Sequence, residues 1–172
     1  MFKSFLLLVL LALSCTNALA QKQERKPSSN PATQSDLRPV YQKWLDEDVV
    51  YIISPEERRA FLLLKGDSER ERFIEQFWRA RDAKPETSVN EYRAEHYRRI
   101  ANANQRFGTG NVLGWRTARG RFYIMLGEPD ETHETSAGEV WFYRHAGSLG
   151  DNVEIEFTQD STGGGYRIRH HP

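Results

Sequence analysis

Two glutamates on a predicted helix are the best candidates for acid–base chemistry. Glu91 and Glu95 are four residues apart, the spacing at which two carboxylates share a helix face as an acid–base pair or as metal ligands. Arg98 and Arg99 lie within one turn of Glu95 and would pair with these carboxylates. We therefore interpret the stretch as a solvated, salt-bridged face. The alternative is a small secreted carboxylate-dependent hydrolase using Glu91, Glu95 or Asp130, which requires a cleft of converging acids, one with a raised pKa.

Acidic and histidine residues also gather after a predicted strand. They are Glu128, Asp130, Glu131, His133 and Glu134. Their spacing matches neither a calcium loop nor a His-Glu-x-x-His zinc motif. The segment has no lysine, which disfavours a phosphate loop, and Pro129 fits the second position of a β-turn. We expect a solvated loop, with no metal ion and no cofactor.

Nucleophilic catalysis has few candidates. The chain has one cysteine, Cys15, and no serine stands in a Gly-x-Ser-x-Gly elbow. Ser148 comes nearest, but no strand–elbow–helix pattern surrounds it. His96 lies on the apolar face of a predicted helix, so we expect it to be packed there.

The strongest candidate for a binding site follows the last predicted helix. Its residues are Gly114, Trp115, Arg116, Thr117, Arg119 and Tyr123. An exposed Trp115 in such a loop would offer a recognition surface. In the interpretation that we favour for the tryptophan itself, a tight turn at Gly114 buries Trp115 between helix and sheet, and Thr117 bonds a local backbone amide.

Arginines form a second binding candidate. Arg79 and Arg81 close the second long helix, where cations complement the helix dipole. The functional alternative is a cluster that grips an acidic partner, made with Arg98, Arg99 and Arg116 or Arg119.

Residues 1–20 have the pattern of a cleavable export signal. A positively charged start precedes a short apolar stretch, and Ala18-Leu19-Ala20 is a small-x-small cleavage site. The apolar stretch is far shorter than the roughly 20 residues of a membrane anchor, so we expect no transmembrane anchor after processing. Cleavage after Ala20 is favoured over lipidation of Cys15, because a lipobox prefers Leu where Ala12 stands. The folded part then has no disulfide and no cysteine metal site.

The charge balance limits the class of partner. The 24 basic and 24 acidic side chains become 23 and 24 when residues 1–20, with Lys3, are removed, a formal net charge of −1. A nucleic-acid-binding protein favours a basic patch and a high pI. The balance therefore argues against nucleic acid and against a polybasic membrane-surface binder.

The remaining chain divides into a tether and one domain. Residues 21–38 are polar, with two prolines, and predict a flexible tether ahead of a single domain over residues 39–172. Helical spacing predicts a short helix over residues 40–48, and Ser54-Pro55 with Glu57 marks the start of a second helix that stops at Gly66. Two longer helices follow, capped at Asp67 or Ser68 and at Thr87 or Ser88, and the last ends at Gly108. The β-branched residues 49–53 are a candidate extended segment.

After Gly110 the apolar period changes to that of strands. Residues 121–126, 139–144, 153–158 and 166–169 are short alternating segments separated by turns. The sequence Val153-Glu154-Ile155-Glu156-Phe157 predicts a sheet with one solvent-facing side. The predicted fold class is α+β, with N-terminal helices packed on a C-terminal antiparallel β-meander of about four strands.

One stretch carries a family resemblance. Gly114-Trp115-Arg116-Thr117-Ala118-Arg119-Gly120-Arg121-Phe122-Tyr123-Ile124, followed by Gly127-Glu128-Pro129-Asp130, resembles the signature of the GWxTD-domain family, and upstream segments such as Phe77-Trp78 resemble it too. The resemblance covers about residues 40–131. It implies an exported or envelope-associated bacterial protein and no assigned activity. Ala118 stands where the family name calls for Asp, and the intact surroundings favour a structural role for that carboxylate.

These observations lead to one expectation of function. We expect a non-enzymatic binding or assembly module of the cell envelope, located in the periplasm or secreted, whose partner is an envelope protein or peptide.

Overall fold

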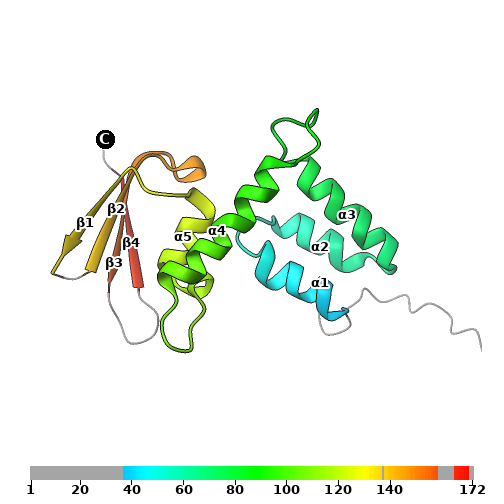
Figure 1. The fold of residues 1–172 in the computed structure, drawn as a ribbon, viewed down its shortest axis with the longest axis horizontal. Helices are drawn as coiled ribbons and strands as arrows, with labels where there is room; N and C mark the ends of the chain where they lie inside the picture. Colours follow the sequence, from blue (N-terminus) through cyan, green and yellow to red (C-terminus); the bar gives the residue numbers. More distant parts are fainter. Residues whose placement is uncertain (1–36, 137, 159–164, 171–172) are drawn as a thin grey trace, which may run out of the picture.

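The computed structural model describes residues 37–136, 138–158 and 165–170 (Figure 1). The predicted export signal, Cys15 and the predicted tether up to residue 36 lie outside the described residues. Leu37 is already buried, so the packed chain begins at least two residues before the predicted start at residue 39. Helices come first and a four-stranded antiparallel sheet last, which confirms the α+β fold class.

Four helical segments form an N-terminal lobe. Helix α1 (Pro39–Lys43) continues into a π-helical turn, η2 (Trp44–Asp48), and α2 (Pro55–Leu63) and α3 (Asp67–Arg79) follow. The N-cap of α3 is Gly66, so the cap predicted at Asp67 or Ser68 is wrong. The predicted capping box of α2 is confirmed, since Ser54 Oγ accepts from the Glu57 amide and the Glu57 carboxylate accepts from the Ser54 amide. The lobe closes around Trp44, whose ring lies 4.9 Å from that of Phe61 and 5.2 Å from that of Phe77.

Residues 49–53 form a turn, so the extended conformation considered for them is wrong. The amides of Ile52 and Ile53 both donate to the carbonyl oxygen of Val49. These hydrogen bonds override the strand preference of the β-branched side chains.

Helix α4 (Glu91–Phe107) connects the two halves of the molecule. Its N-cap is Asn90, whose side chain accepts from the Arg93 amide, and not Thr87 or Ser88; it ends before Gly108 as predicted. Tyr97 packs on the core of the N-terminal lobe, whereas Ala103 and Phe107 belong to the core beneath the sheet. One helix therefore contributes to both cores (Figure 1).

The chain then forms a helix where a strand was expected. After the short helix η3 (Gly114–Arg116), helix α5 covers Ala118–Leu126, so the predicted strand over residues 121–126 is wrong. Phe122, Tyr123 and Ile124 are consecutive and all buried, because α5 lies between α4 and the sheet. A helix buried on most sides has no polar face, and its sequence loses the helical period.

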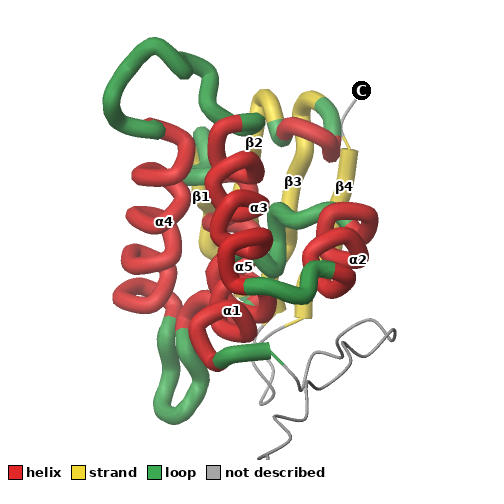
Figure 2. Tube along the Cα trace, turned by 90° about the vertical axis from the view of Figure 1, so that its right-hand side faces the viewer, coloured by secondary structure: helices red, strands yellow, loops and turns green. Residues whose placement is uncertain are grey.

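The sheet is a meander in the order β1-β2-β3-β4. Its strands are β1 (Glu131–Thr135), β2 (Gly138–His145), β3 (Asp151–Thr158) and β4 (Gly165–His170), with η4 (Gly147–Leu149) between β2 and β3. The loop expected over residues 131–134 is wrong, since this segment is β1. In β3 the apolar residues are buried and Glu154 and Glu156 point the other way, as predicted. Figure 2 shows α4 and α5 over one face of the sheet.

Candidate functional site

The Gly-Trp-x-Thr sequence is the point where three backbone segments meet. A Cβ atom on Gly114 would lie 1.9 Å from the carbonyl oxygen of Ala103 in α4. A Cβ atom on Gly120 would lie 1.9 Å from the carbonyl oxygen of Gly114. The two glycines therefore let η3 pack directly on α4, and let α5 pack directly on η3.

Trp115 is buried, with 8% of its surface exposed, as the favoured interpretation predicts. Its amide donates to Asn104 Oδ1 at 3.0 Å, and its carbonyl oxygen accepts from the Tyr51 hydroxyl at 2.9 Å. Tyr51 belongs to the turn of the N-terminal lobe, so Trp115 joins the two lobes.

Thr117 is the N-cap of α5, also as predicted. Its hydroxyl donates to the Gly114 carbonyl oxygen at 2.7 Å and accepts from the Gly120 amide at 3.0 Å. Ala118 is the first residue of α5, so a carboxylate at this position would lie beside the free amides of the first turn. This placement fits a structural role for the aspartate that the family name calls for.

The remaining predicted binding residues do not share one surface. Arg116 is exposed and stacks over Trp115, with the guanidinium carbon 4.8 Å from the ring centre. Arg119 pairs with Glu139 of β2 at 3.1 Å, and Tyr123 is buried beneath α4. Of the six residues, four build the core and the two arginines reach solvent.

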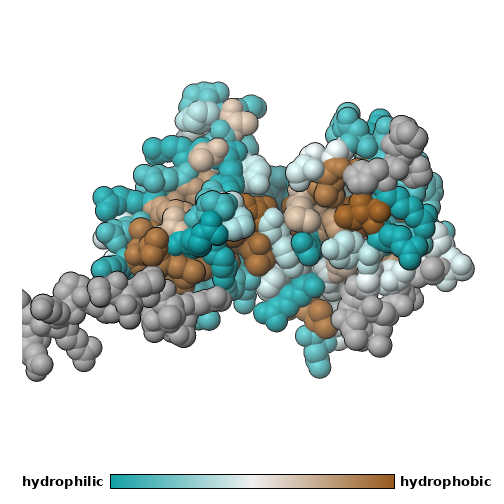
Figure 3. All heavy atoms as spheres, turned by 180° about the vertical axis from the view of Figure 1, so that it is seen from behind, coloured by the Kyte–Doolittle hydropathy of each residue, from teal (hydrophilic) through white to brown (hydrophobic). Residues whose placement is uncertain are grey.

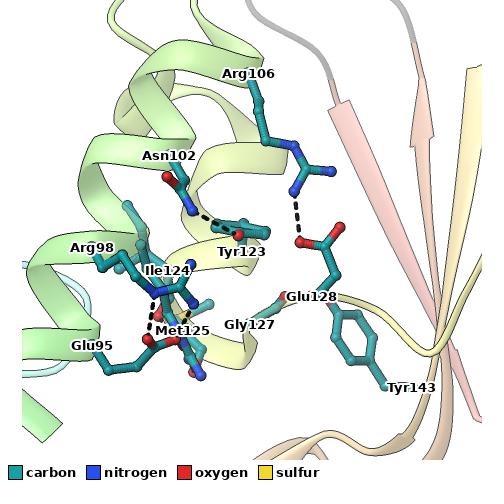
Figure 4. A network of polar contacts seen from close by, with 11 residues as sticks. Glu95, Arg98, Asn102, Arg106, Tyr123, Ile124, Met125, Gly127, Glu128 and Tyr143 are labelled. Carbon is teal, nitrogen blue, oxygen red and sulfur yellow. Dashed lines mark hydrogen bonds and ion pairs between the residues drawn. The ribbon is translucent and has the colours of Figure 1, made fainter. Parts of the chain in front are cut away.

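The salt-bridged face expected on α4 is present (Figure 4). Glu95 accepts from Arg98 Nε at 2.6 Å and from Arg99 Nε at 2.7 Å. The hydrogen bond from Arg98 comes first among the effects that lower the pKa of Glu95, to about 2, and Arg99 adds to it. Glu95 is therefore held as a carboxylate, the opposite of a proton donor with a raised pKa.

The turn after α5 contributes the other end of this polar network (Figure 4). Glu128 accepts from Arg106 at 2.6 Å, and this bond lowers the pKa of Glu128. Tyr143 donates to the Gly127 carbonyl oxygen at 3.1 Å. These contacts fasten the turn to α4 and the sheet.

The acids named for a hydrolase have separate partners. Glu91 lies against Thr87, Glu95 against Arg98 and Arg99, and Asp130 accepts from the Arg144 amide. Within the described ranges, no three His, Cys, Asp or Glu side chains are grouped so that they could hold a metal ion. Each of the three acids therefore has a hydrogen-bond partner of its own, and the pKa of Glu95 is lowered and not raised.

His96 and the arginine cluster also have structural partners. His96 is buried, as predicted, with Nε2 2.6 Å from the Asp48 carbonyl oxygen, and burial lowers its pKa. Arg98 and Arg99 share Glu95, whereas Arg81, Arg116 and Arg119 each pair with a carboxylate of their own, so these arginines are engaged within the chain. The pairs are Arg81 with Glu57, Arg98 and Arg99 with Glu95, Arg116 with Glu47, and Arg119 with Glu139.

A groove of about 430 Å³ at the junction of the lobes was not foreseen from the sequence. Its size is within the range of ligand pockets. The lining comes from the 49–53 turn, α4, α5, the β2–β3 connection and β4. These residues are Tyr51, Ile52, Tyr92, Arg121, Phe122, Met125, Leu126, Gly147, Ser148, Leu149, Tyr166 and Ile168.

The groove is lined by aromatic and aliphatic side chains, with polar groups among them. Tyr92 and Tyr166 expose 40% and 44% of their surface, and the rings of Phe122 and Tyr166 meet edge to face at 4.7 Å. On the face drawn in Figure 3, hydrophobic side chains reach the surface on both lobes and where the lobes meet. A lining of this kind suits an apolar ligand or a segment of another protein.

Arg121 is the single charged side chain among the residues that line the groove. Its guanidinium carbon lies 5.5 Å from the centre of the Tyr51 ring, and it forms no ion pair with the part of the chain that the structure describes. An exposed cation beside aromatic rings favours a ligand with an acidic group.

Comparison with known proteins gives one match. A family model described as the GWxTD domain matches residues 21–166. No curated protein and no solved structure gives a significant match. In the described parts of the chain, no helix has the length and apolar character needed to cross a membrane.

Proposed function

The chain belongs to the GWxTD-domain family, and from this premise we propose that it is an exported, non-enzymatic binding or assembly module of the bacterial cell envelope. Its groove holds a segment of a partner protein between the two lobes. The partner is an envelope protein or peptide, and nucleic acid is not among its ligands.

The observation that carries the proposal is the groove itself. Five separate chain segments contribute aromatic or apolar side chains to one open surface, and Arg121 is its single charged group. Tyrosines with an apolar ring and a polar hydroxyl are enriched at sites where another protein binds, and Tyr51, Tyr92 and Tyr166 all line the groove. Of the acids named for a hydrolase, Glu95 pairs with Arg98 and Arg99 and has a lowered pKa, Asp130 pairs with Arg144, and Glu91 accepts from Thr87.

The proposed location depends on residues 1–20, whose sequence has the pattern of an export signal. Mass spectrometry of the mature amino terminus tests it. A chain that starts at Gln21 supports release into the periplasm or medium, and a lipid-modified Cys15 supports anchoring in a membrane. An unprocessed Met1 on protein recovered from the cytoplasm would contradict export.

Site-specific photocrosslinking in cells tests the groove. A photoreactive phenylalanine analogue at Tyr166 or Leu149 lies in the groove, and the same analogue at His133 of β1 is the control, since His133 is exposed and outside it. We expect one discrete protein adduct from both groove positions and none from residue 133. Equal adducts at all three positions, or none in the groove, would contradict the proposal.

A further inference from the structure

Strand β4 is an edge strand of the described sheet and also lines the groove. It is the last strand of the order β1-β2-β3-β4, and it pairs only with β3 among the described strands. Figure 2 shows it at the margin of the sheet opposite β1. An edge strand presents N–H and C=O groups on its outer side, and these can pair with another extended chain.

The two faces of β4 differ in chemistry. Tyr166 and Ile168 lie opposite the buried residues Phe157 and Ile155 of β3, and both line the groove. Arg167 and Arg169 point to the other face, where 71% and 49% of their side chains are exposed. An added strand would therefore meet an apolar surface on one face and two cations on the other.

We propose that β4 and the groove together take up an extended partner segment as a fifth strand, one whose side chains alternate between apolar and acidic. This inference rests on the proposed function and names the chemistry of its ligand. The apolar side chains of the segment enter the groove beside Phe122 and Tyr166. Its acidic side chains lie across from Arg167 and Arg169. Backbone pairing supplies affinity, and the alternating side chains supply selectivity.

The chain contains an example of such a strand on the inner side of β4. Strand β3 has the sequence Val153-Glu154-Ile155-Glu156-Phe157. Its glutamates lie opposite the β4 arginines, Glu156 across from Arg167 and Glu154 across from Arg169, and Glu156 Oε2 lies 2.7 Å from Arg169 Nη2. Strand β4 thus already pairs with an alternating apolar and acidic strand along its inner edge. We expect its outer edge to bind a segment with the same alternation.

The charge of β4 also argues against a second copy of this chain as the occupant. In an antiparallel pair of β4 strands whose groove faces lie on the same side, residues of equal parity oppose each other. At the centre of such a pair, arginine faces arginine, and like charges directly opposite are destabilising. An acidic partner strand removes this repulsion.

A synthetic peptide with the sequence of Asp151–Thr158 is a direct probe. It is titrated into the isotope-labelled, processed protein, and the control peptide carries lysine in place of both glutamates. We expect the acidic peptide to slow hydrogen exchange at β4 amides and to bind at least about tenfold more tightly than the lysine peptide. The double variant Arg167→Glu/Arg169→Glu should reverse this preference, and a thermal melt verifies that the variant is folded.

Backbone pairing is tested with N-methylated peptides. Methylation of alternate residues blocks the N–H groups on one side of the strand only, so one methylated peptide should lose binding and the peptide methylated at the other positions should retain it. Equal binding of both methylated peptides, or of the acidic and lysine peptides, would overturn the inference. The inference would also be overturned if light scattering showed a dimer of the protein that the acidic peptide does not dissociate.

The two proposals fail separately. Photocrosslinks from Tyr166 and Leu149 without binding of the acidic peptide would leave the groove as a binding site and remove strand addition. If the peptide bound at β4 but no crosslinks formed in cells, the proposal of an envelope partner would be contradicted. The proposal that β4 pairs with an apolar and acidic strand would stand.

Discussion

Gly114 and Gly120 are the positions where substitution by alanine tests most directly why glycine stands in the family signature. A methyl group on either would overlap a backbone carbonyl, of Ala103 or of Gly114, and a backbone carbonyl cannot rotate away as a side chain can. We expect Gly114→Ala and Gly120→Ala each to lower the free energy of unfolding by about 3 kcal/mol or more, the upper end of overpacking effects. Urea denaturation followed by circular dichroism measures this.

The matched control is Gly66→Ala. A Cβ at this position has Glu69 Oε2 at 3.9 Å as its nearest contact, and the φ angle of −109° suits any residue. Only the preference for glycine at an N-cap is lost, about 1 kcal/mol or less. Similar losses in all three variants would refute the backbone contact as the reason for the signature glycines.

His96 gives the molecule a predictable pH dependence. Burial lowers its pKa below the ordinary 6.5, against the opposing effect of the Asp48 carbonyl oxygen. The unfolded chain thus binds the proton more readily. The contribution of neutral His96 to stability is complete above the unfolded pKa of 6.5 and is lost as the pH falls from there through the lowered pKa of the folded state. We expect the free energy of unfolding to decrease from pH 7.5 to pH 5.5.

Urea denaturation at the two pH values measures this decrease, and the variant His96→Gln should show less of it. An NMR titration midpoint for His96 at or above 6.5 would contradict the argument.

At the scale of elements, the first turn of α5 is where this chain departs from its family. Thr117 caps the helix, and Ala118 follows at the first helical position. We expect Ala118→Asp to raise the free energy of unfolding by about 0.3–1 kcal/mol, because a carboxylate beside free helix amides is stabilised by the helix dipole. Ala101→Asp, at an exposed position inside α4, should instead destabilise by about half a kcal/mol from helix propensity. A loss of stability in Ala118→Asp would show that the structure disfavours the family residue here.

Local signals explain which elements could be predicted. The capping box at Ser54 and the glycine after α4 act within a few residues, so both could be identified in the sequence. The sequence of helix α5 resembles that of a strand because Phe122, Tyr123 and Ile124 are consecutive apolar residues and all three are buried. Strand β1 was missed because its five residues are polar and exposed, and only pairing with β2 makes it a strand.

The candidate site was harder to predict than the fold. The burial of Trp115 and the bonds of Thr117 followed from local turn chemistry. The groove did not, since its lining comes from five segments that only the packing of α4 and α5 brings together. Arg121, placed on a strand in the sequence-based prediction, lines the groove because α5 is a helix.

At the scale of the whole molecule, two hydrophobic cores share one helix. The first core surrounds Trp44 and Phe61, and the second contains Trp141 and Ile155. Helix α4 enters both. His96 and Tyr97 of this helix contact Asp48 at 2.6 Å and 3.2 Å, and Tyr51 reaches Trp115. Loss of either core therefore removes packing from the helix on which the other depends, and we expect the two lobes to unfold together.

Phe61→Ala tests this coupling, because Phe61 is fully buried in the N-terminal core, a cluster to which no residue of the described strands belongs. We expect a loss of about 3–5 kcal/mol, the usual cost of removing a buried phenylalanine. Hydrogen exchange read by mass spectrometry should show equal losses of protection in α3 and in β3, since cooperative unfolding exposes both. Leu63→Ala in the same helix is the control, because Leu63 is 60% exposed and its truncation should change little. If α3 lost protection and β3 did not, the two lobes would unfold independently. A partner in the groove would then bind at a junction between two halves that are not coupled in their unfolding.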